Sequence, residues 1–323
     1  MLIPARPTHR PSKPSPYSPR PTNTMLFAFL TLFAWTLGSF SGARCASVMG
    51  GFAANRLRIA SSLLVLIVVV AVTRTDPQIP YASWFLLAGL LHLGLGDVGL
   101  YTAYHHLGPR LAVLIGLCGA PLVTFLVEGL VWNHWPGLWQ CLLALAIMVG
   151  VIIALAPDEK SRLKDHQSWT TGLIAGGIAA LGVGSGSAVT SHAYKLLGGA
   201  EQADFAFHTS AMGLRLVGGI FGLLVLGLLF WRKTPFLPLP EHRPLVWRWM
   251  PLSVLMGPVL GVACYHLALA QVPEASLVQA VISLIPVAVI PLSWSILGDR
   301  PTRRALIGAV IGVAAAVGLA LVR

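Results

Sequence analysis

Long apolar runs alternate with short polar connections along almost the whole chain. Ten runs are each long enough for about 20 helical residues, the length that crosses the hydrocarbon core of a bilayer. They lie near residues 25–43, 50–73, 82–106, 110–132, 135–156, 169–194, 205–231, 247–271, 274–297 and 302–322. This pattern predicts an all-α membrane protein with ten transmembrane helices.

Part of the pattern occurs twice, at a constant offset of 165 residues. Residues 84–136 align with residues 249–301 without a gap, and Pro121 aligns with Pro286 (286 − 121 = 165). The connection at 157–168 is the most polar stretch of the chain and divides the runs five and five. Because five is an odd number, the second set must enter the membrane from the opposite side. The repeat predicts two inverted five-helix halves, an arrangement typical of transporters with a substrate site between the halves.

The same boundaries divide the chain into segments. Residues 1–24 hold seven prolines, four basic residues and no acid, which is typical of a disordered tail. Met25 directly precedes the first apolar run, so both Met1 and Met25 stay open as the start of the protein. After this tail we expect a first five-helix repeat over 25–156, a polar linker over 157–168 and a second repeat over 169–323.

The composition agrees with a membrane protein and excludes several other classes. Hydrophobic residues make up 56% of the chain and charged residues only 10%, against about 25% charged in soluble domains. The net charge of +11 comes from residues set singly between apolar blocks, so it does not indicate nucleic-acid binding. The four cysteines lack CxxC spacing, and we expect no metal site and no cofactor.

Several short motifs follow one another in a recognisable order. Arg56 begins Arg-Leu-Arg-Ile-Ala, Gly96 begins Gly-Asp-Val-Gly-Leu-Tyr-Thr-Ala-Tyr, and prolines stand at 121 and 286. Near the end of the second copy is Gly298-Asp299-Arg300, where the first copy has Asn133-His134-Trp135. Over nearly everything after residue 25, the chain resembles the drug/metabolite transporter superfamily, in particular the EamA-domain transporters. Members usually carry Gly-Glu-Arg where this chain has Gly-Asp-Arg.

The resemblance implies ten helices, export or exchange of small metabolites, a cell (inner or plasma) membrane location, and both termini in the cytoplasm. Lys and Arg counts in the connections favour the reverse orientation by the positive-inside rule. We follow the resemblance for the expected orientation.

Charged side chains inside the apolar runs are the first candidates for a site, because hydrocarbon rarely accepts an unpaired charge. Of the eleven acids, Asp97 lies near the middle of a run and Glu128 about one turn from the end of another. Arg56 or Arg215 could neutralise Asp97 or bind a substrate carboxylate, and Arg58 could extend its head group to the membrane surface.

The repeated helices supply the remaining candidates. Pro121 and Pro286 each remove a helical hydrogen bond at equivalent points of the two halves. The repeat also pairs Tyr101 with His266. We expect a central cavity lined by Asp97, Tyr101, Tyr104, Pro121, Tyr265, His266, Gln279 and Pro286, with Trp35 and Arg56 as further members.

These features predict a transporter that works by alternating access on amino-acid-like or drug-like solutes. Proton coupling would need Asp97 or His266 as the titrating group, and an uncoupled facilitator stays an alternative. Small-residue ladders, such as Gly308, Gly312 and Ala316, are compatible with a monomer or a homodimer. An intramembrane enzyme is the rival class. The run Gly184-Ser185-Gly186-Ser187 with His192 superficially offers a serine and a histidine, but the chain has no proper GxSxG motif, no HExxH motif and no Asp/Glu cluster.

Overall fold

The computed structural model describes residues 25–73, 79–107, 109–155, 166–198, 205–230, 237–297 and 302–322. Every regular element in these parts of the chain is a helix. The tail at 1–24, nearly all of the linker at 157–168 and the Gly298–Arg300 motif lie outside the described residues.

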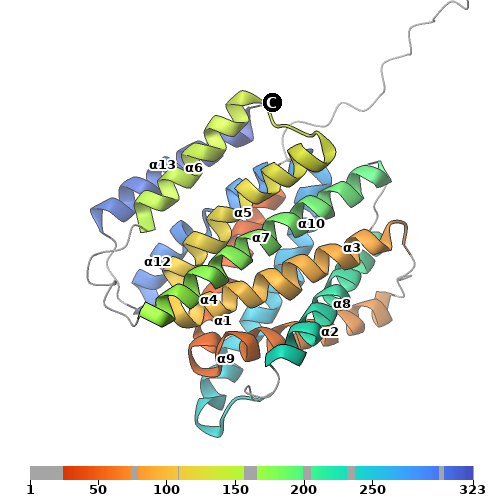
Figure 1. The fold of residues 1–323 in the computed structure, drawn as a ribbon, viewed down its shortest axis with the longest axis vertical. Coiled ribbons are helices and arrows are strands. Elements are labelled where there is room, and N and C mark those ends of the chain that lie inside the picture. The colour runs from red at the N-terminus through yellow and green to blue at the C-terminus, as the bar shows by residue number, and fades with distance from the viewer. Residues whose placement is uncertain are drawn as a thin grey trace, which may run out of the picture.

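The helices follow the predicted apolar runs. In the first half they are α1 (Leu26–Met49), α2 (Gly51–Thr73), α3 (Ala82–Gly89), η1 (Leu90–Gly96), α4 (Asp97–Leu107), α5 (Pro109–Trp132) and α6 (Leu138–Leu155). In the second half they are α7 (His166–Leu197), α8 (Phe205–Phe230), η5 (Pro240–His242), α9 (Arg243–Val254), η6 (Leu255–Val259), α10 (Leu260–Gln271), α11 (Ala275–Ile282), α12 (Ile285–Leu297) and α13 (Arg303–Leu321). Figure 1 shows these helices packed in one bundle.

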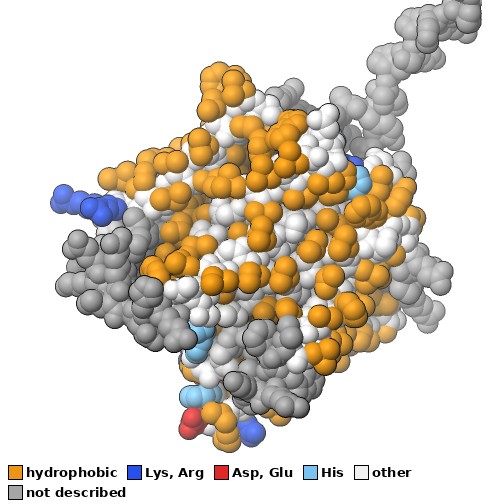
Figure 2. Space-filling view, viewed as in Figure 1, with side chains coloured by type: hydrophobic (Ala, Val, Ile, Leu, Met, Phe, Trp, Pro, Cys, Tyr) orange, Lys and Arg blue, Asp and Glu red, His pale blue; other side chains and the backbone are white. Residues whose placement is uncertain are grey.

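Within the described residues, eight helical segments are long and apolar enough to cross a membrane, and α6 is a shorter apolar helix. Large apolar side chains on these helices are exposed, such as Phe33, Leu130 and Leu228. Figure 2 shows hydrophobic side chains spread across the viewed face, with the coloured Lys and Arg atoms near its margins. An apolar belt of this extent fits a multi-pass membrane protein. The tenfold crossing of the membrane stays a prediction.

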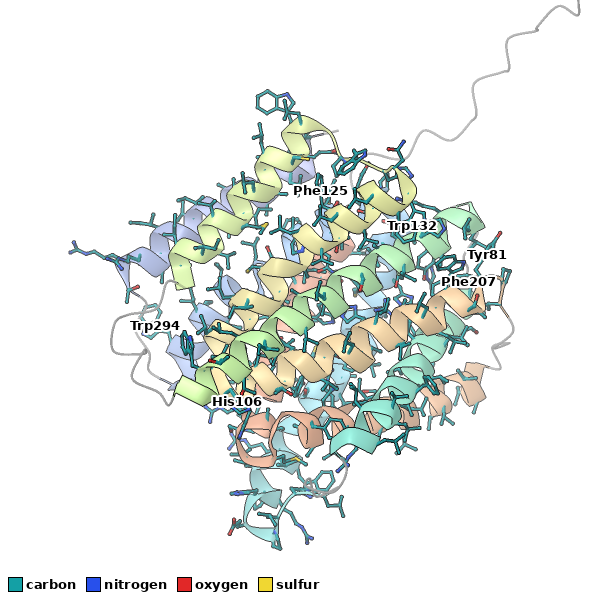
Figure 3. The ribbon with its side chains drawn as sticks, in the orientation of Figure 1. Tyr81, His106, Phe125, Trp132, Phe207 and Trp294 are labelled. Carbon is teal, nitrogen blue, oxygen red and sulfur yellow. The ribbon has the colours of Figure 1, made fainter. Side chains whose placement is uncertain are left out.

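Aromatic residues mark the two ends of the bundle. Figure 3 places Tyr81, Trp132 and Phe207 at one end, which we call the Tyr81 end, and His106 and Trp294 at the other, the His106 end. Aromatic side chains concentrate where membranes meet water. Both ends therefore have the character of a membrane interface.

The third and eighth apolar runs both contain a stretch of π-helix. The π-helical segments η1 and η6 begin at Leu90 and Leu255, which are equivalent positions of the repeat (255 − 90 = 165). The fourth and ninth runs differ from each other. Helix α5 continues across Pro121, whereas Ser283 and Leu284 separate α11 from α12 just before Pro286.

The small-residue ladders pack helices together within the chain. A side chain at Gly308 would collide with the backbone of Gly150 and Ala154, because α13 lies directly against α6. Figure 1 shows this pair side by side at one edge of the bundle. The ladder of α7 approaches α5 in the same way, since a side chain at Gly184 would meet Ala120 and Val123. The ladders thus have partners inside one copy of the chain.

Candidate functional site

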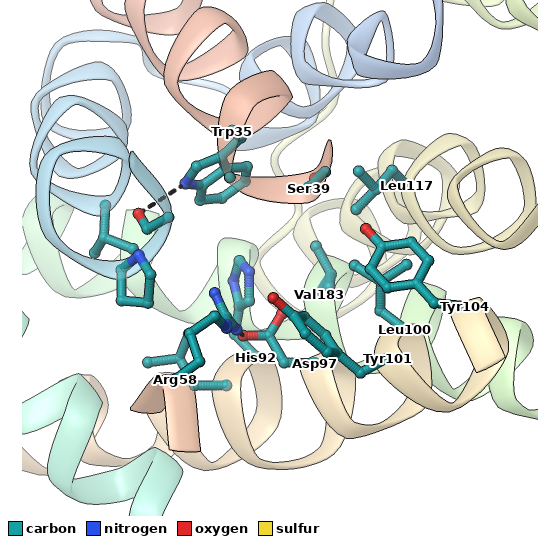
Figure 4. A pocket seen from close by; sticks show the side chains of 15 residues that line it. Trp35, Ser39, Arg58, His92, Asp97, Leu100, Tyr101, Tyr104, Leu117 and Val183 are labelled. Carbon is teal, nitrogen blue, oxygen red and sulfur yellow. Dashed lines mark hydrogen bonds and ion pairs between the residues drawn. The ribbon is translucent and has the colours of Figure 1, made fainter. Parts of the chain in front are cut away.

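A cavity of about 50 Å³ lies among helices of both halves and is partly open to solvent. Its walls come from α1, α2, η1, α4 and α5 of the first half and from α7, η6 and α10 of the second. The lining residues are Trp35, Gly38, Ser39, Arg58, His92, Leu93, Asp97, Leu100, Tyr101, Tyr104, Leu117, Val183, Gly257, Pro258 and Val262. Figure 4 shows Arg58, His92 and Asp97 close together on one side.

A buried ion pair forms the polar part of the wall. Nη2 of Arg58 donates to Oδ2 of Asp97, and both side chains are almost fully buried. The same nitrogen donates to Oδ1 of Asn55 at 2.9 Å. The guanidinium also lies 4.8 Å from the centre of the Tyr101 ring. Asp97 is therefore paired with Arg58, and the expectation that Arg56 or Arg215 is its partner is wrong. Arg58 does not extend to the membrane surface.

Aromatic side chains form much of the remaining wall. The Tyr101 hydroxyl lies 3.3 Å from Oγ of Ser253, which joins α4 to α9. Nε1 of Trp35 donates to the carbonyl of Gly257 in η6 at 3.3 Å. Tyr104 lies one turn beyond Tyr101, two residues before His106, so the cavity extends toward the His106 end. These contacts join α1 and α4 of the first half to the second half.

The π-helical turns of η1 bring His92 to the same wall as Asp97. The backbone N–H of Asp97 donates to the carbonyl of His92, five residues earlier. In an α-helix these side chains would point about 140° apart, because each residue turns the chain by about 100°. A five-residue hydrogen-bond spacing brings them close to the same face. Sequence reasoning missed His92 because an α-helical register would have separated it from Asp97.

A second buried cluster lies next to the cavity and contains Arg215, which is 0% exposed. Nη2 of Arg215 donates to Nδ1 of His92 at 2.9 Å, and Nη1 donates to Nε2 of His266 at 3.2 Å. Nη1 also donates to Oγ1 of Thr190 at 3.0 Å. The Tyr194 hydroxyl lies 3.0 Å from Nδ1 of His266. His92 is thus the contact between this cluster and the cavity wall.

The expected site residues therefore fall into separate places. The cavity described above is lined by four of them, Trp35, Asp97, Tyr101 and Tyr104. Tyr265, His266 and Gln279 are buried beside it, where Nε2 of Gln279 donates to the Tyr265 hydroxyl at 2.9 Å. The remaining candidates, Pro121, Pro286 and Arg56, are buried away from the lining, and the guanidinium of Arg56 lies 5.7 Å from the centre of the Phe52 ring. Their role stays a prediction.

Glu128 belongs to a different polar cluster, near the Tyr81 end. Its carboxylate accepts from the backbone N–H groups of Ala275 at 2.9 Å and Ser276 at 3.0 Å. Nζ of Lys195 lies 3.5 Å away. The side chain is only 1% exposed. Glu128 of the first half therefore caps the first turn of α11 in the second half, where the helix dipole favours a negative charge.

The residues named for the enzyme alternative make other contacts. Oγ of Ser185 donates to the carbonyl of Leu181 in its own helix. The His192 ring stacks on Trp132, with the ring centres 4.4 Å apart. Within the described part of the chain, no group of three or more His, Cys, Asp or Glu side chains is placed to hold a metal ion.

Comparisons with known proteins agree with this architecture. Residues 170–321 match the model of the EamA-like transporter family. Among the solved structures, 25 chains match. One of them, described as "Crystal structure of protein", superposes with a TM-score of 0.67 at 16% identity, covering 91% of this chain and 95% of its own. That likeness shows a shared fold. No curated protein sequence matches the chain.

Proposed function

We propose that the protein moves small metabolites across a membrane by alternating access, because residues 170–321 match the model of the EamA-like transporter family. The observation that carries the proposal is the buried Arg58–Asp97 pair in the wall of a cavity that both halves enclose. Charges at such depth are costly and usually mark a substrate path.

The two inverted halves belong to the same proposal, with ten transmembrane helices in all. Sγ of Cys118 lies 3.6 Å from the carbonyl oxygen of Ser283, and these residues are equivalent in the repeat (283 − 118 = 165). Two equivalent residues can touch only near the axis that relates their halves. The paired π-helical segments support the same symmetry. Inverted halves can expose a shared site to one side at a time.

The proposed solutes are small amino-acid-like or drug-like molecules. The ion pair can exchange partners with a polar solute, and Trp35, Tyr101 and Tyr104 can contact an apolar part. The proposed location is the cell (inner or plasma) membrane with both termini in the cytoplasm. A C-terminal reporter that is active only outside the cell would contradict this orientation.

For proton coupling, the geometry favours Asp97 over His266 as the titrating group. Nε2 of His266 accepts from Arg215, so a proton there would remove that bond and place two cations in contact. Asp97 can release Arg58 to a solute and take up a proton in exchange. An uncoupled facilitator of the same fold would carry solute without this step.

The first experiment identifies solutes and tests the site together. Metabolites of cells that express the wild-type protein are compared with those of cells that express Asp97→Asn at equal membrane levels. Solutes that differ are then measured in proteoliposomes. We expect flux with the wild-type protein and strong loss with Asp97→Asn, while Arg44→Gln, outside the cavity, transports normally. If no solute distinguishes wild type from Asp97→Asn, the proposed site is wrong.

Coupling is tested with the same proteoliposomes under an imposed pH gradient. We expect the gradient to drive uptake by the wild-type protein and by His266→Ala, but not by Asp97→Asn. Downhill flux that ignores the pH gradient in the wild-type protein would identify a facilitator.

A further inference from the structure

The buried charges around the cavity do not cancel. Arg58 and Arg215 contribute two positive charges and Asp97 one negative charge, which leaves a net charge of +1. Among the described residues, no carboxylate lies within ion-pair distance of Arg215. Asp97, whose charge reaches Arg215, is itself bonded to Arg58. An arginine stays protonated in proteins, so this site carries positive charge that none of the described side chains neutralises.

The hydrogen bonds fix the protonation of the neighbouring histidines. An arginine can only donate, so Nδ1 of His92 and Nε2 of His266 must both accept from Arg215. Both rings are therefore neutral and add no charge. The proton of His92 is then on Nε2, the ring nitrogen that Arg215 does not contact. Because Nδ1 accepts from a cation, Nε2–H becomes a stronger donor.

His92 thus connects the unneutralised charge with the cavity. Its ring lines the cavity beside Arg58 and Asp97 and makes no other hydrogen bond within the described part of the chain. Figure 4 shows its ring next to Arg58, with Trp35 across the cavity. A solute with one anionic group could accept from Nε2–H of His92 and from Arg58 together, and it would neutralise the net charge.

We propose that the transported solute carries a carboxylate or similar single negative charge, with His92 and Arg58 as its binding groups and Arg215 as the positioning residue behind His92. This inference rests on the proposed function and names the solute class of the same cavity. The aromatic and aliphatic walls favour an organic anion over an inorganic one.

The test compares matched acids and amides, which have nearly the same shape but different charge. The probe pairs are benzoate with benzamide, phenylacetate with phenylacetamide, and indole-3-acetate with indole-3-acetamide. Binding to the full-length protein in nanodiscs is measured by calorimetry at constant ionic strength, with sodium chloride and sodium phosphate titrated separately. We expect at least one acid to bind about tenfold or more tightly than its amide, since charge-assisted hydrogen bonds are about twice as strong as neutral ones.

Two variants test the assigned roles through this acid-to-amide ratio, which a purely structural defect would leave unchanged. Arg215→Gln should bring the ratio close to one. His92→Phe keeps an aromatic ring at this position but removes Nε2–H, so it should lower the acid-to-amide ratio. This variant keeps the proposal testable even if Arg215→Gln does not fold. Arg44→Gln removes an arginine that lies over Phe40 and Trp249, and it should keep the wild-type ratio.

The outcomes separate this inference from the proposed function. Equal binding of acids and amides, no binding of any acid, or an unchanged ratio in both variants overturns the anionic solute class. Binding of chloride or phosphate with no organic acid also overturns it in favour of an inorganic anion. None of these results would contradict a metabolite flux that depends on Asp97. The absence of such a flux would count against the transporter proposal instead.

Discussion

Asp97 and Glu128 are both acids inside apolar helices, and they lie in contrasting surroundings. Asp97 faces a cavity and bonds to Arg58, beside a second buried arginine. Glu128 does not line this cavity, and its two oxygens accept from the first N–H groups of α11 while Lys195 lies close by. Asp97 is a single acid beside two buried arginines, whereas Glu128 has a hydrogen-bond donor for each of its two oxygens.

The contrast indicates how to distinguish a binding charge from a structural one. A carboxylate with backbone donors on both oxygens is held in place by those bonds, and moving it would leave the start of a helix without its cap. A pair such as Arg58–Asp97 can open and close again with a different partner. Burial alone does not separate the two cases, because both side chains are buried.

The largest expected effect comes from Asp97→Ala. It leaves Arg58 buried without its counter-charge, which costs about 3–5 kcal/mol in comparable sites. We expect a clear fall in the Tm of the purified protein together with loss of solute flux in proteoliposomes.

The double variant Arg58→Leu with Asp97→Ala separates these two losses. Removal of both charges should restore most of the Tm, because no unpaired charge remains, while solute flux stays lost. Recovery of flux in the double variant would show that the pair is only structural.

A smaller effect is expected for Glu128→Gln. One amide oxygen cannot accept both N–H groups of Ala275 and Ser276 as the carboxylate does, at a cost of about 1–3 kcal/mol. We expect a lower Tm and faster labelling of a Ser276→Cys reporter by a water-soluble maleimide, since the first turn of α11 loosens. The acid-to-amide ratio should not change.

Glu241→Gln is the matched control, because Glu241 is 72% exposed and pairs only with His242 among the described residues. It should leave both the Tm and the labelling rate at their wild-type values. A shifted binding ratio in Glu128→Gln, rather than a shifted labelling rate, would place Glu128 in the solute site.

The smallest expected effect concerns Glu274, which lies between the segments Pro240–Gln271 and Ala275–Ile296. Burial, followed by the charge of Glu128, raises the pKa of Glu274 above its ordinary value of 4.5. The folded state therefore holds this proton more tightly than the unfolded state. The resulting stability is complete below pH 4.5 and is lost as the pH rises through the folded-state pKa.

Thermal unfolding at several pH values measures this contribution. The Tm of Glu274→Gln should fall less than that of the wild type as the pH rises from 4.5. Glu128→Gln should also weaken the dependence of the Tm on pH, because it removes the negative charge that is the second cause of the raised pKa of Glu274. An identical pH profile in wild type and Glu274→Gln would contradict the assignment.

Much of the fold was predictable from local pattern. An apolar run long enough to span a bilayer must form a helix there, since its backbone groups can only bond within the segment. The structure has helices on each predicted run and eight candidate spans among its described residues. Four of the expected site residues also line the cavity. Asp97, Tyr101 and Tyr104 were predictable as polar and aromatic side chains of a repeated helix, whereas Trp35 lies outside the repeat.

By itself, the sequence determined that this is a helical membrane protein with a repeated pattern and a buried acid at Asp97, because hydropathy and spacing act locally. Only the tertiary structure decided the partners. It selected Arg58 for Asp97 across 39 positions and the start of α11 for Glu128 across 147. The π-helical register brought His92 onto the wall with Asp97, where Arg215 reaches it across 123 positions. Such pairings depend on how helices rotate and pack against one another, and the hydropathy of a run does not specify that rotation.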